Sequence, residues 1–519
     1  MANLRALAQT LGPVGHLPTW MLVIGTGAFW IELFFIPIPG GHTSWLAWCL
    51  WLGIVAFVLR GTSQWSLPNL SFIDKVALSL ICIYVLIILY ASLLPPHLPQ
   101  EFDAINYHLM LPRQHLIAEN FFHIPWSVPD LFLLPLDYAL APFALCTTLP
   151  NKFPQFLFFI GCIMLAYQLI VNFSKGNKQH ALLGVMAFLA LHIIAIQAGT
   201  AMLDLVMLYC ALACVHSLCK GRFVMAAIEG SFLFWSKSFM PIQMVLITLG
   251  IMGLVFVLKR CGFTLEEKIV ITKKNILTLM VTGLLVSVCI ASPHLLRSFY
   301  YTGSPLYPLG VGIMSPVKIL SSNRTQAIKD RANDSVAIKD AYGEGKGIIA
   351  FMKHFWIMAV PTKGVNNHFD YPLGLMYLLM LFPFLLMFFA FLGKKKIPIL
   401  ALTICAWWGV WWFGSQQSRF LIIPISMLVI MTIAHMKDIG RVLITLIMFT
   451  MVIEIVSLTN AHRPDWGKST LDVLRPKDKE ILQLTSQKKH VILHNEPDVA
   501  FAETRIQVES NDSIYVFPR

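Results

Sequence analysis

The sequence predicts an all-α protein that crosses a membrane many times. Of its 519 residues, 57% are hydrophobic and only 13% are charged, whereas a soluble protein carries about 25% charged residues. Long apolar runs recur along most of the chain, and a membrane-spanning helix needs about 20 such residues. Both observations argue against a string of soluble domains. Only the part after residue 459 reads as a separate folded unit.

The apolar runs give about thirteen candidate spans. Several neighbours are separated only by a proline, a glycine or a lysine, so their limits are approximate. The predicted spans are residues 18–38, 44–60, 74–95, 153–173, 180–198, 202–219, 222–238, 240–258, 275–295, 373–393, 397–413, 419–436 and 441–459.

Positive charge predicts how these spans are oriented. Lys and Arg residues of short loops collect on the cytoplasmic side of membrane proteins. Here the basic loops fall on one side of the membrane if the N-terminus is cytoplasmic, as with Lys394 to Lys396 after the tenth span. The outer side then receives the loops 96–152 and 295–372, the Gly199–Asp204 turn and the C-terminal region 460–519.

This orientation requires that the apolar segment 130–149 does not cross the membrane. Pro135, Asp137 and Pro142 interrupt it, so we interpret it as a helix in the outer interface or one that dips back from it. The apolar piece from Gly347 to Val360 is too short to span, and we place it at the interface too.

We divide the chain into a transmembrane domain, residues 1–459, and a small C-terminal region, residues 460–519. A helix-like pattern around residues 476–487 and an alternating run from Val491 predict a small α/β appendage there. The net charge of +12 falls largely in the short loops, so it does not suggest a nucleic-acid partner. The ten cysteines lie almost wholly in apolar runs, which predicts no disulfide framework and no cysteine-based zinc site.

The stretch Glu101–Arg113 is the first candidate for a functional site. It is a polar and aromatic segment between long apolar runs, at the start of a predicted outer loop. We predict that Asp103 is a catalytic base, with Glu101 as a water-exposed neighbour. Asp is also a favoured helix N-cap, so Asp103 could instead cap a helix, and the two roles are compatible.

Further charged residues fall at the outer ends of other spans. Asp204 opens a span there, where acids usually face an interior cavity. The cations Lys237, Arg297 and Arg419 are predicted on the outer side, where basic residues are rare, which suggests an anionic partner. A phosphate group fits, since arginine offers a planar fork to it, but ordinary phospholipid headgroups would satisfy the same charges. Glu229 falls mid-span, and we interpret it as structural.

Several segments together resemble bacterial multi-spanning glycosyltransferases of the GT-C superfamily, family-39-like, a group that includes protein O-mannosyltransferases and aminoarabinose lipid A transferases. The most distinctive are Thr302-Gly-Ser-Pro-Leu-Tyr-Pro and Ser415-Gln-Gln-Ser-Arg-Phe, together with Asp103-Ala-Ile-Asn-Tyr-His-Leu. The resemblance covers most of residues 75–435. It implies a GT-C-type helical bundle in the bacterial inner membrane, with the active site and C-terminus periplasmic, and a polyprenyl-phosphate sugar as donor.

The resemblance also implies roles for individual residues. The first-loop acid of the family maps to Asp103, where many relatives have Asp-Glu but this chain has Ala104 next. That departure disfavours transfer of mannose to protein. Asp204 maps to a second catalytic acid. The donor phosphate would be held by Lys237, Arg297 and Arg419, and the acceptor or sugar would contact Tyr107, His108, Arg113 and Gln416. Independently of the resemblance, the aromatic rings of Tyr107, Trp126 and Tyr301 could stack on sugars.

The residues suit this chemistry in their own right. A lipid phosphate is a good leaving group, so transfer needs a base for the acceptor's hydroxyl proton and cations for the charge that grows on the phosphate. Attack on the face opposite the phosphate would invert the anomeric centre. We assign no metal site because no close-ligand spacing such as His-Glu-x-x-His is present, although a divalent metal ion stays open as a cofactor.

The expected function is therefore transfer of a sugar from a polyprenyl phosphate to an envelope glycan, lipid or protein. The alternative is a transporter or flippase of lipid-linked sugars, which would use the same cations around an inner cavity. Transporters often contain paired repeats and broken helices at the membrane midplane, and the sequence shows no such repeat. A non-catalytic membrane scaffold is the third hypothesis.

Overall fold

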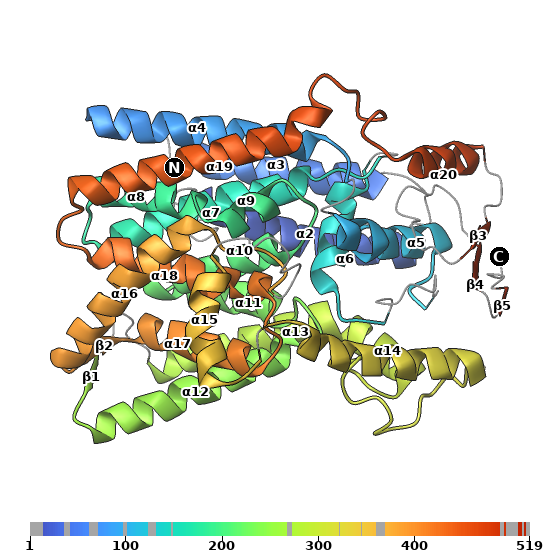
Figure 1. Ribbon diagram of the computed structural model, residues 1–519. Coiled ribbons are helices and arrows are strands. Elements are labelled where there is room, and N and C mark those ends of the chain that lie inside the picture. Colours follow the sequence, from blue (N-terminus) through green and yellow to red (C-terminus); the bar gives the residue numbers. More distant parts are fainter. Residues whose placement is uncertain are drawn as a thin grey trace.

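A computed structural model of the chain describes residues 14–35, 42–61, 71–96, 101–122, 131–146, 149–266, 272–320, 322–343, 345–359, 369–487, 492–494, 507–510 and 513–514, and all structural statements concern these residues. Within them the protein is almost entirely helical (Figure 1). Trp126, a predicted sugar-stacking residue, lies outside the described residues.

The helices of the first half are η1 (Val14–His16), α2 (Leu17–Phe35), α3 (His42–Gly61), α4 (Phe72–Leu93), η2 (Ala104–His108), α5 (Met110–Ala118), α6 (Pro135–Ala144), α7 (Phe153–Phe173), α8 (Lys178–Leu189), α9 (His192–Ala198), α10 (Asp204–Cys219), α11 (Phe223–Phe234) and α12 (Met240–Arg260). Those of the second half are α13 (Lys273–Thr302), α14 (Ser322–Ala341), α15 (Ile348–Ile357), α16 (Leu375–Gly393), α17 (Ile399–Phe413), η3 (Ser418–Leu421), α18 (Ile422–His435), α19 (Arg441–His462), η4 (Arg463–Asp465) and α20 (Pro476–Ser486).

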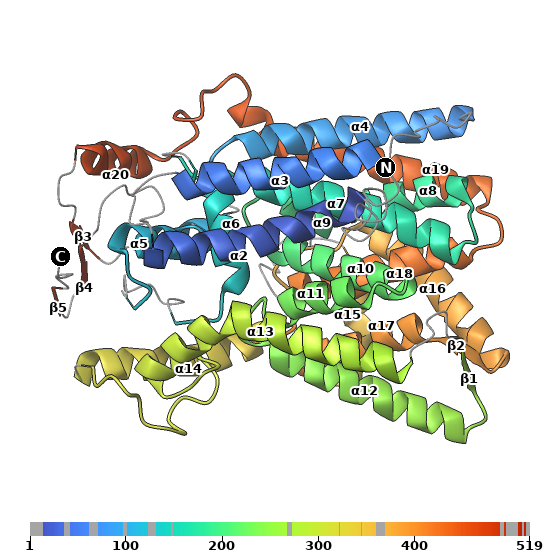
Figure 2. The ribbon, with the colours of Figure 1, turned by 180° about the vertical axis from the view of Figure 1, so that it is seen from behind.

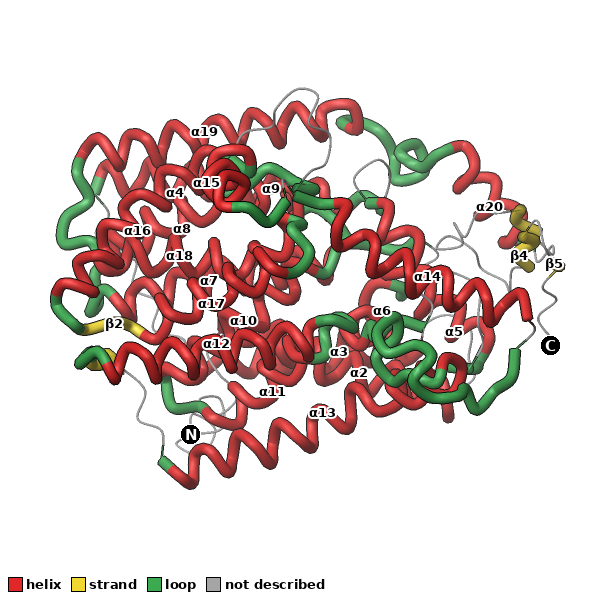
Figure 3. Tube along the Cα trace, turned by 60° about the horizontal axis from the view of Figure 1, so that its bottom comes forward, coloured by secondary structure: helices red, strands yellow, loops and turns green. Residues whose placement is uncertain are grey.

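The strands are few and short, and they stand at opposite ends of the molecule (Figure 3). At one end, β1 (Thr264–Glu266) pairs in parallel with β2 (Lys396–Pro398). At the other end, β3 (Ile492–His494), β4 (Gln507–Ser510) and β5 (Ser513–Ile514) form a small sheet in the order β3-β4-β5. We call the second end, where α5, α14 and α20 also lie, the loop end (Figures 1 and 2).

The multi-pass membrane fold is confirmed, but the number of spans is not. Eight helical segments of the described chain are long and apolar enough to cross a membrane, and the bent pair α8–α9 makes a ninth. The other four predicted spans fall on α3, α10, α11 and α17, whose apolar stretches are shorter than 18 residues. The apolar-length criterion therefore located helices correctly without establishing that thirteen of them cross.

Burial follows the pattern expected in lipid. Every residue of α18 from Ile422 to Ala434 is buried at the centre of the bundle. In contrast, α12 and α13 expose large apolar side chains such as Leu249, Met280 and Leu284. Water would not tolerate so broad an apolar surface, but a hydrocarbon phase does, so these two helices are lipid-facing.

The mid-span acid Glu229 has the partners that its position requires. Its Oε1 lies 2.6 Å from His16 Nδ1, and Ser217 donates to its Oε2 over 2.8 Å. His16 in turn meets His216 over 2.8 Å. A buried charge is tolerated when it is paired and hydrogen-bonded, so this network fastens η1 to α10 and α11, as a structural role for Glu229 requires.

A second acid within a predicted span, Glu454, lies beside the break between α8 and α9, where the helix axis turns by 72°. His192, the first residue of α9, lies 2.8 Å from Glu454 in the middle of α19. The His192 amide also donates to the Leu373 carbonyl over 3.1 Å. The turn thus replaces helical hydrogen bonds with tertiary ones, which is how irregular backbone survives at membrane depth.

The interrupted segment 130–149 forms α6, a helix of ten residues that is too short to cross. That agrees with the predicted orientation. It does not lie at a lipid surface, however, because all ten residues are buried and pack closely against α2. Neighbouring helices enclose it, and the expectation that it lies in the outer interface or dips back from it stays a prediction. Residues 130, 147 and 148 lie outside the described chain.

The helix α15 and the C-terminal region complete the fold. The helix α15 packs against α17, where Trp408 donates to His354, and it exposes Ile348, Ile349 and Met352; its interfacial position stays a prediction. The C-terminal region returns to the 96–152 segment, which the sequence predicts to be the first outer loop, and there Leu474 and Ile481 join a buried cluster with Met110 of α5. The tail is therefore packed against the segment that carries Asp103.

Close packing of α2 on α6 gives a test of the fold. A Cβ atom added at Gly25 would lie 1.8 Å from the Ala139 carbonyl oxygen, whereas one added at Gly27 meets nothing within 4 Å. We expect Gly25→Ala to cost about 1–3 kcal/mol through overpacking and to lower the thermal unfolding temperature of the detergent-solubilised protein. The matched control, Gly27→Ala, should leave it unchanged; equal behaviour of the two variants would contradict this packing.

Candidate functional site

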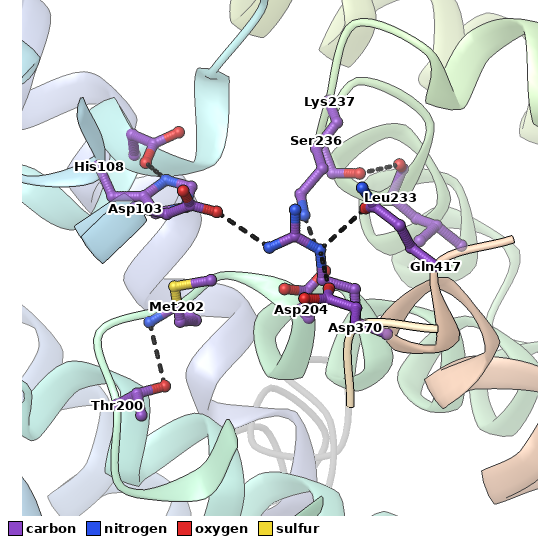
Figure 4. A network of polar contacts seen from close by, with 12 residues as sticks. Asp103, His108, Thr200, Met202, Asp204, Leu233, Ser236, Lys237, Asp370 and Gln417 are labelled. Atoms are coloured by element: carbon purple, nitrogen blue, oxygen red, sulfur yellow. Dashed lines mark hydrogen bonds and ion pairs between the residues drawn. The ribbon is translucent and has the colours of Figure 1, made fainter. Parts of the chain in front are cut away.

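Five charged side chains from separate segments meet in one place. Asp103 precedes η2, Asp204 begins α10, Lys237 follows α11, Asp370 precedes α16 and Arg419 lies in η3. We call these five residues the charged cluster. Figure 4 shows Asp103 on one side of it, with Asp204 and Asp370 close together on the other. Sequence separations of up to 316 residues are bridged here.

Arg419 is the centre of the cluster. Its Nη1 donates to Asp103 Oδ2 over 2.9 Å, and its Nε lies 3.1 Å from Asp370 Oδ2. The Nε also donates to the Gln417 side chain over 3.2 Å. A guanidinium can join two acids in this way because its donors are fixed in one plane. A single side chain thus connects the first outer loop to the segment before α16.

Asp103 is not a helix cap. It stands before η2, but its side chain makes no capping hydrogen bond to that turn. The carboxylate turns to Arg419 instead, and Tyr107 also hydrogen-bonds to it. The capping alternative is therefore wrong, and the Asp103 side chain contacts Arg419 and Tyr107 instead of the helix backbone.

Asp204 and Lys237 form the second ion pair. Lys237 Nζ donates to Asp204 Oδ1 over 2.7 Å, and only 1% of the Asp204 side chain is exposed. Lys237 also lies over the ring of Phe420, 5.5 Å from its centroid, and Arg419 lies at the same distance from that ring. Both cations therefore lie near the same aromatic ring. Lys237 is a partner of an acid here and does not simply extend to the membrane surface.

Asp370 is held by Ser418. The Ser418 amide donates to the Phe369 carbonyl over 2.6 Å, and the Tyr371 amide donates to the Ser418 hydroxyl over 3.0 Å. These bonds fall on either side of Asp370, whose φ is +78°. A non-glycine residue with this backbone is uncommon and costs about 1–3 kcal/mol. The surrounding hydrogen bonds hold the strained segment so that the carboxylate reaches Arg419.

The electrostatic surroundings separate Asp103 from Asp370. Burial by itself raises the pKa of Asp103, but the charges of Arg419 and His108 and the hydrogen bonds from Arg419 and Tyr107 lower it below its ordinary value overall. Burial raises the pKa of Asp370 to about 6; Arg419 opposes this rise, and the carboxylates of Asp204 and Asp103 add to it. Asp103 is thus a firmly ionised counter-ion, and Asp370 titrates near neutrality.

A buried pair beside the cluster fixes the first outer loop. Lys152 Nζ lies 2.6 Å from Glu101 Oε1, and the Ala201 amide donates to Glu101 Oε2 over 3.2 Å. Glu101 is only 3% exposed and Lys152 is fully buried. The prediction that Glu101 is exposed to water is therefore wrong. Its carboxylate ties the loop before Asp103 to the turn that leads into Asp204.

His108 lies in a neighbouring pair. Its Nδ1 contacts Asp137 of α6 in a buried ion pair. His108 and Asp103 lie side by side in Figure 4. Because His108 is engaged with Asp137, it acts on Asp103 through its charge and through the position of η2. The predicted sugar contact at His108 stays a prediction.

The other predicted residues make their contacts outside the cluster. Arg297 is buried in α13 and lies over the ring of Phe121, 5.1 Å from its centroid. Arg113 is buried within α5. Gln416 is also buried, and its Nε2 donates to the carbonyls of Gly345 and Trp412 over 3.1 and 3.2 Å. Tyr301, predicted to stack on sugars, donates to the Phe122 carbonyl.

Three residues of the site were missed by sequence reasoning. Asp370 is the most important of them, and its signal was available: it is an acid directly before a span, on the predicted outer side, as Asp204 is. Asp137 was noticed only because it interrupts an apolar run. Lys152 gave no signal, since a lysine before a span reads as an ordinary interfacial residue.

The arrangement supports acid–base chemistry next to bound anions. Three carboxylates face two cations, so the cluster carries one net negative charge when all five groups are ionised. Asp103, Asp370 and Arg419 keep 17% to 22% of their side chains exposed. In the described part of the chain, no three His, Cys, Asp or Glu side chains form a group that could hold a metal ion.

The comparisons with known proteins add no assignment. No protein-family model matches the sequence, and no curated protein matches it. The candidate site therefore stands on its geometry and on the sequence motifs.

The Glu101–Lys152 pair yields a stability prediction. Removing one partner of a buried ion pair leaves an uncompensated charge and costs about 3–5 kcal/mol. We expect Lys152→Met to lower the thermal unfolding temperature strongly. The double variant Glu101→Gln/Lys152→Met should recover part of the loss, because it removes the orphaned charge.

The control for this prediction is Lys468→Met. Lys468 pairs with Asp465 over 3.6 Å, but its side chain is 43% exposed, and exposed pairs contribute about 0–1 kcal/mol. A Lys152→Met protein as stable as Lys468→Met would show that the pair does not anchor the loop.

Proposed function

We propose that this protein is a membrane glycosyltransferase that moves a sugar from a polyprenyl-phosphate donor to an envelope glycan, lipid or protein. In this proposal the helices form a GT-C-type bundle in the bacterial inner membrane, and the loop end is periplasmic. The observation that carries it is the charged cluster: Arg419 and Lys237, two cations at span ends, face three aspartates from distant segments.

The cluster supplies the functions that such a transfer requires. A carboxylate takes the proton of the acceptor hydroxyl, and cations stabilise the charge that develops on the leaving phosphate. Lys237 has three N–H donors and uses one of them on Asp204, so it can also bind a phosphate oxygen. The base is one of the cluster's carboxylates, for which the sequence predicts Asp103, and attack opposite the phosphate makes the reaction inverting.

Lipid access supports the same proposal. The helix α15 presents Ile348, Ile349 and Met352 outward. Lys346, just before α15, donates to the carbonyls of Trp412 and Gly414 over 2.7 and 2.9 Å. Shortly after Gly414 the chain enters η3, which contains Arg419. An apolar surface therefore leads to the segment that carries the cluster. A polyprenyl chain would lie on such a surface with its phosphate toward Arg419.

The transfer assay uses the purified full-length protein in lipid nanodiscs. The donors are undecaprenyl phosphates carrying radiolabelled glucose, mannose or 4-amino-4-deoxyarabinose, and the acceptor is an envelope fraction from cells that make the protein. We expect one label to move to the acceptor. We expect Asp103→Asn to accumulate in the membrane but to lose about 10²–10⁴-fold in rate.

Two controls define this prediction. Asp465→Asn changes an aspartate far along the chain from the cluster, in η4, and should transfer at the wild-type rate. Full activity of Asp103→Asn would remove Asp103 from the mechanism. Failure of every donor to label an acceptor, with folded protein, would contradict the glycosyltransferase proposal.

One observation favours the transporter alternative. The bent pair α8–α9 is a broken helix, and an ionisable pair, His192 and Glu454, stands at the break. Transporters use such breaks near the midplane to bind substrate. Liposomes that contain the protein and a fluorescent undecaprenyl phosphate separate the two functions. Movement of the label between leaflets without any transfer of sugar would support the flippase.

A further inference from the structure

We propose that Asp370, and not Asp103, receives the proton of the acceptor hydroxyl, while Asp103 serves as the fixed counter-ion of Arg419. This inference rests on the proposed function and assigns the base of that reaction. It follows from three features of the segment Phe369–Tyr371: its strained backbone, the way Ser418 holds it, and the geometry of Asp370 against Arg419.

The positive φ of Asp370 differs in its setting from those of the other non-glycine residues. Of the described non-glycine residues, only four have a positive φ: Glu119, Lys175, Asp370 and Lys395. The first follows the end of α5, and two lie in exposed turns after α7 and α16. Asp370 alone is in a charged cluster. Strain that is retained at such a site is commonly part of how the site works.

Ser418 makes the strained conformation stable. Its hydroxyl contacts the carbonyl oxygens of Phe369 and Tyr371 and accepts the amide of Tyr371, while its own amide donates to Phe369. Ser418 is fully buried and adjoins Arg419 in the chain. The acid and its cation are therefore positioned by one element, so their separation is set by local geometry and not by a flexible loop.

Asp370 is placed to exchange a proton. Its side chain is 18% exposed, so an acceptor hydroxyl can reach it from the solvent side. Burial, with the nearby carboxylates, holds its pKa at about 6, and a general base works best when its pKa lies near the working pH. The charged and titratable groups that act on it or on its neighbour are Arg419, Asp204, Asp103, Lys237, Tyr371 and Tyr342.

Asp103 is unsuited to that role. One of its oxygens is occupied by Arg419 Nη1 at 2.9 Å, and Tyr107 donates a further hydrogen bond. These contacts favour the ionised form and lower its basicity. The same contacts make it a good counter-ion, because they hold the guanidinium in the plane that also reaches Asp370. Asp103 is thus a positioning residue in this scheme.

The chemical step is balanced. The acceptor oxygen forms a bond to the anomeric carbon, and the bond between that carbon and the phosphate oxygen breaks. The electron pair of the broken bond leaves with the polyprenyl phosphate. The acceptor proton moves to the Asp370 carboxylate. The cluster loses its net negative charge in the same step in which the phosphate gains one, so the charge of Arg419 is no longer shared with an ionised Asp370 and can favour the leaving group.

Binding of a donor analogue tests the titration of Asp370. The probe is undecaprenyl methyl phosphate, a diester whose single charge does not change between pH 5 and 7.5. Protonated Asp370 no longer repels it, so we expect the full-length protein in nanodiscs to bind about tenfold more tightly at pH 5 than at pH 7.5. Asp370→Asn should bind tightly at both pH values. Asp103→Asn should retain the pH dependence.

Chemical rescue tests the proton transfer itself. Azide is an anionic nucleophile with no proton to lose, so a missing base does not matter to it. With the labelled undecaprenyl phosphate sugars of the transfer assay, we expect Asp370→Asn to lose about 10²–10⁴-fold in transfer to a hydroxyl acceptor and to recover with sodium azide by forming the glycosyl azide. Asp103→Asn should not recover. Asp370→Glu, which keeps the carboxyl, should transfer slowly and retain the pH dependence.

The outcomes separate this inference from the function on which it rests. If wild-type protein transfers sugar but Asp370→Asn keeps the pH dependence of binding, another group titrates and the inference is overturned. If azide rescues Asp103→Asn instead, Asp103 is the base and the inference is overturned as well. If the wild type neither binds the diester nor transfers a sugar, the proposed function itself fails. Asp370→Glu decides the question should Asp370→Asn not fold: loss of its pH dependence would also overturn the inference.

Discussion

The guanidinium of Arg419 is the constraint on which the site depends. It joins Asp103 in the first outer loop to Asp370 before α16, and its own backbone follows Ser418, which holds the Asp370 segment. Guanidinium and carboxylates in a partly buried place stabilise one another only if each keeps its partner. The positions of the three segments are therefore interdependent, and the charged cluster is organised around a single side chain.

The charges of the cluster do not balance. Two cations face three acids, and a phosphate would add a further negative charge. The raised pKa of Asp370 relieves this imbalance in the proposed reaction, because the acid that is least stabilised by cations accepts the proton as the leaving phosphate gains its charge. Asp103 and Asp204 each have a direct hydrogen bond from a cation and stay ionised. Pairs of acids with pKa values pushed apart by their surroundings are how a site divides acid–base roles.

Much of this could be predicted from the sequence, and the reason is physical. Lys237 and Arg419 stood out because cations are rare on the outer side of a membrane, and Asp204 because acids are rare at span ends. The length of the apolar runs located the helices, because a span must cover the hydrocarbon layer. Apolar length could not predict the break between α8 and α9 or the enclosure of α6, because tertiary contacts such as His192 with Glu454 decide them.

The wrong exposure predicted for Glu101 and the omission of Asp370 have a common cause. Glu101 and Asp370 lie in polar surroundings in the sequence, where an exposed side chain is the ordinary outcome, and their burial depends on partners 51 and 49 positions away, Lys152 and Arg419 respectively. Local pattern carries no information at that distance. Yet both partners are cations adjoining predicted spans, and an unpaired cation at such a place needs an acid. Searching the outer loops for acids to match each such cation would have found Asp370, so charge balance across loops extends what periodicity can predict in a membrane protein.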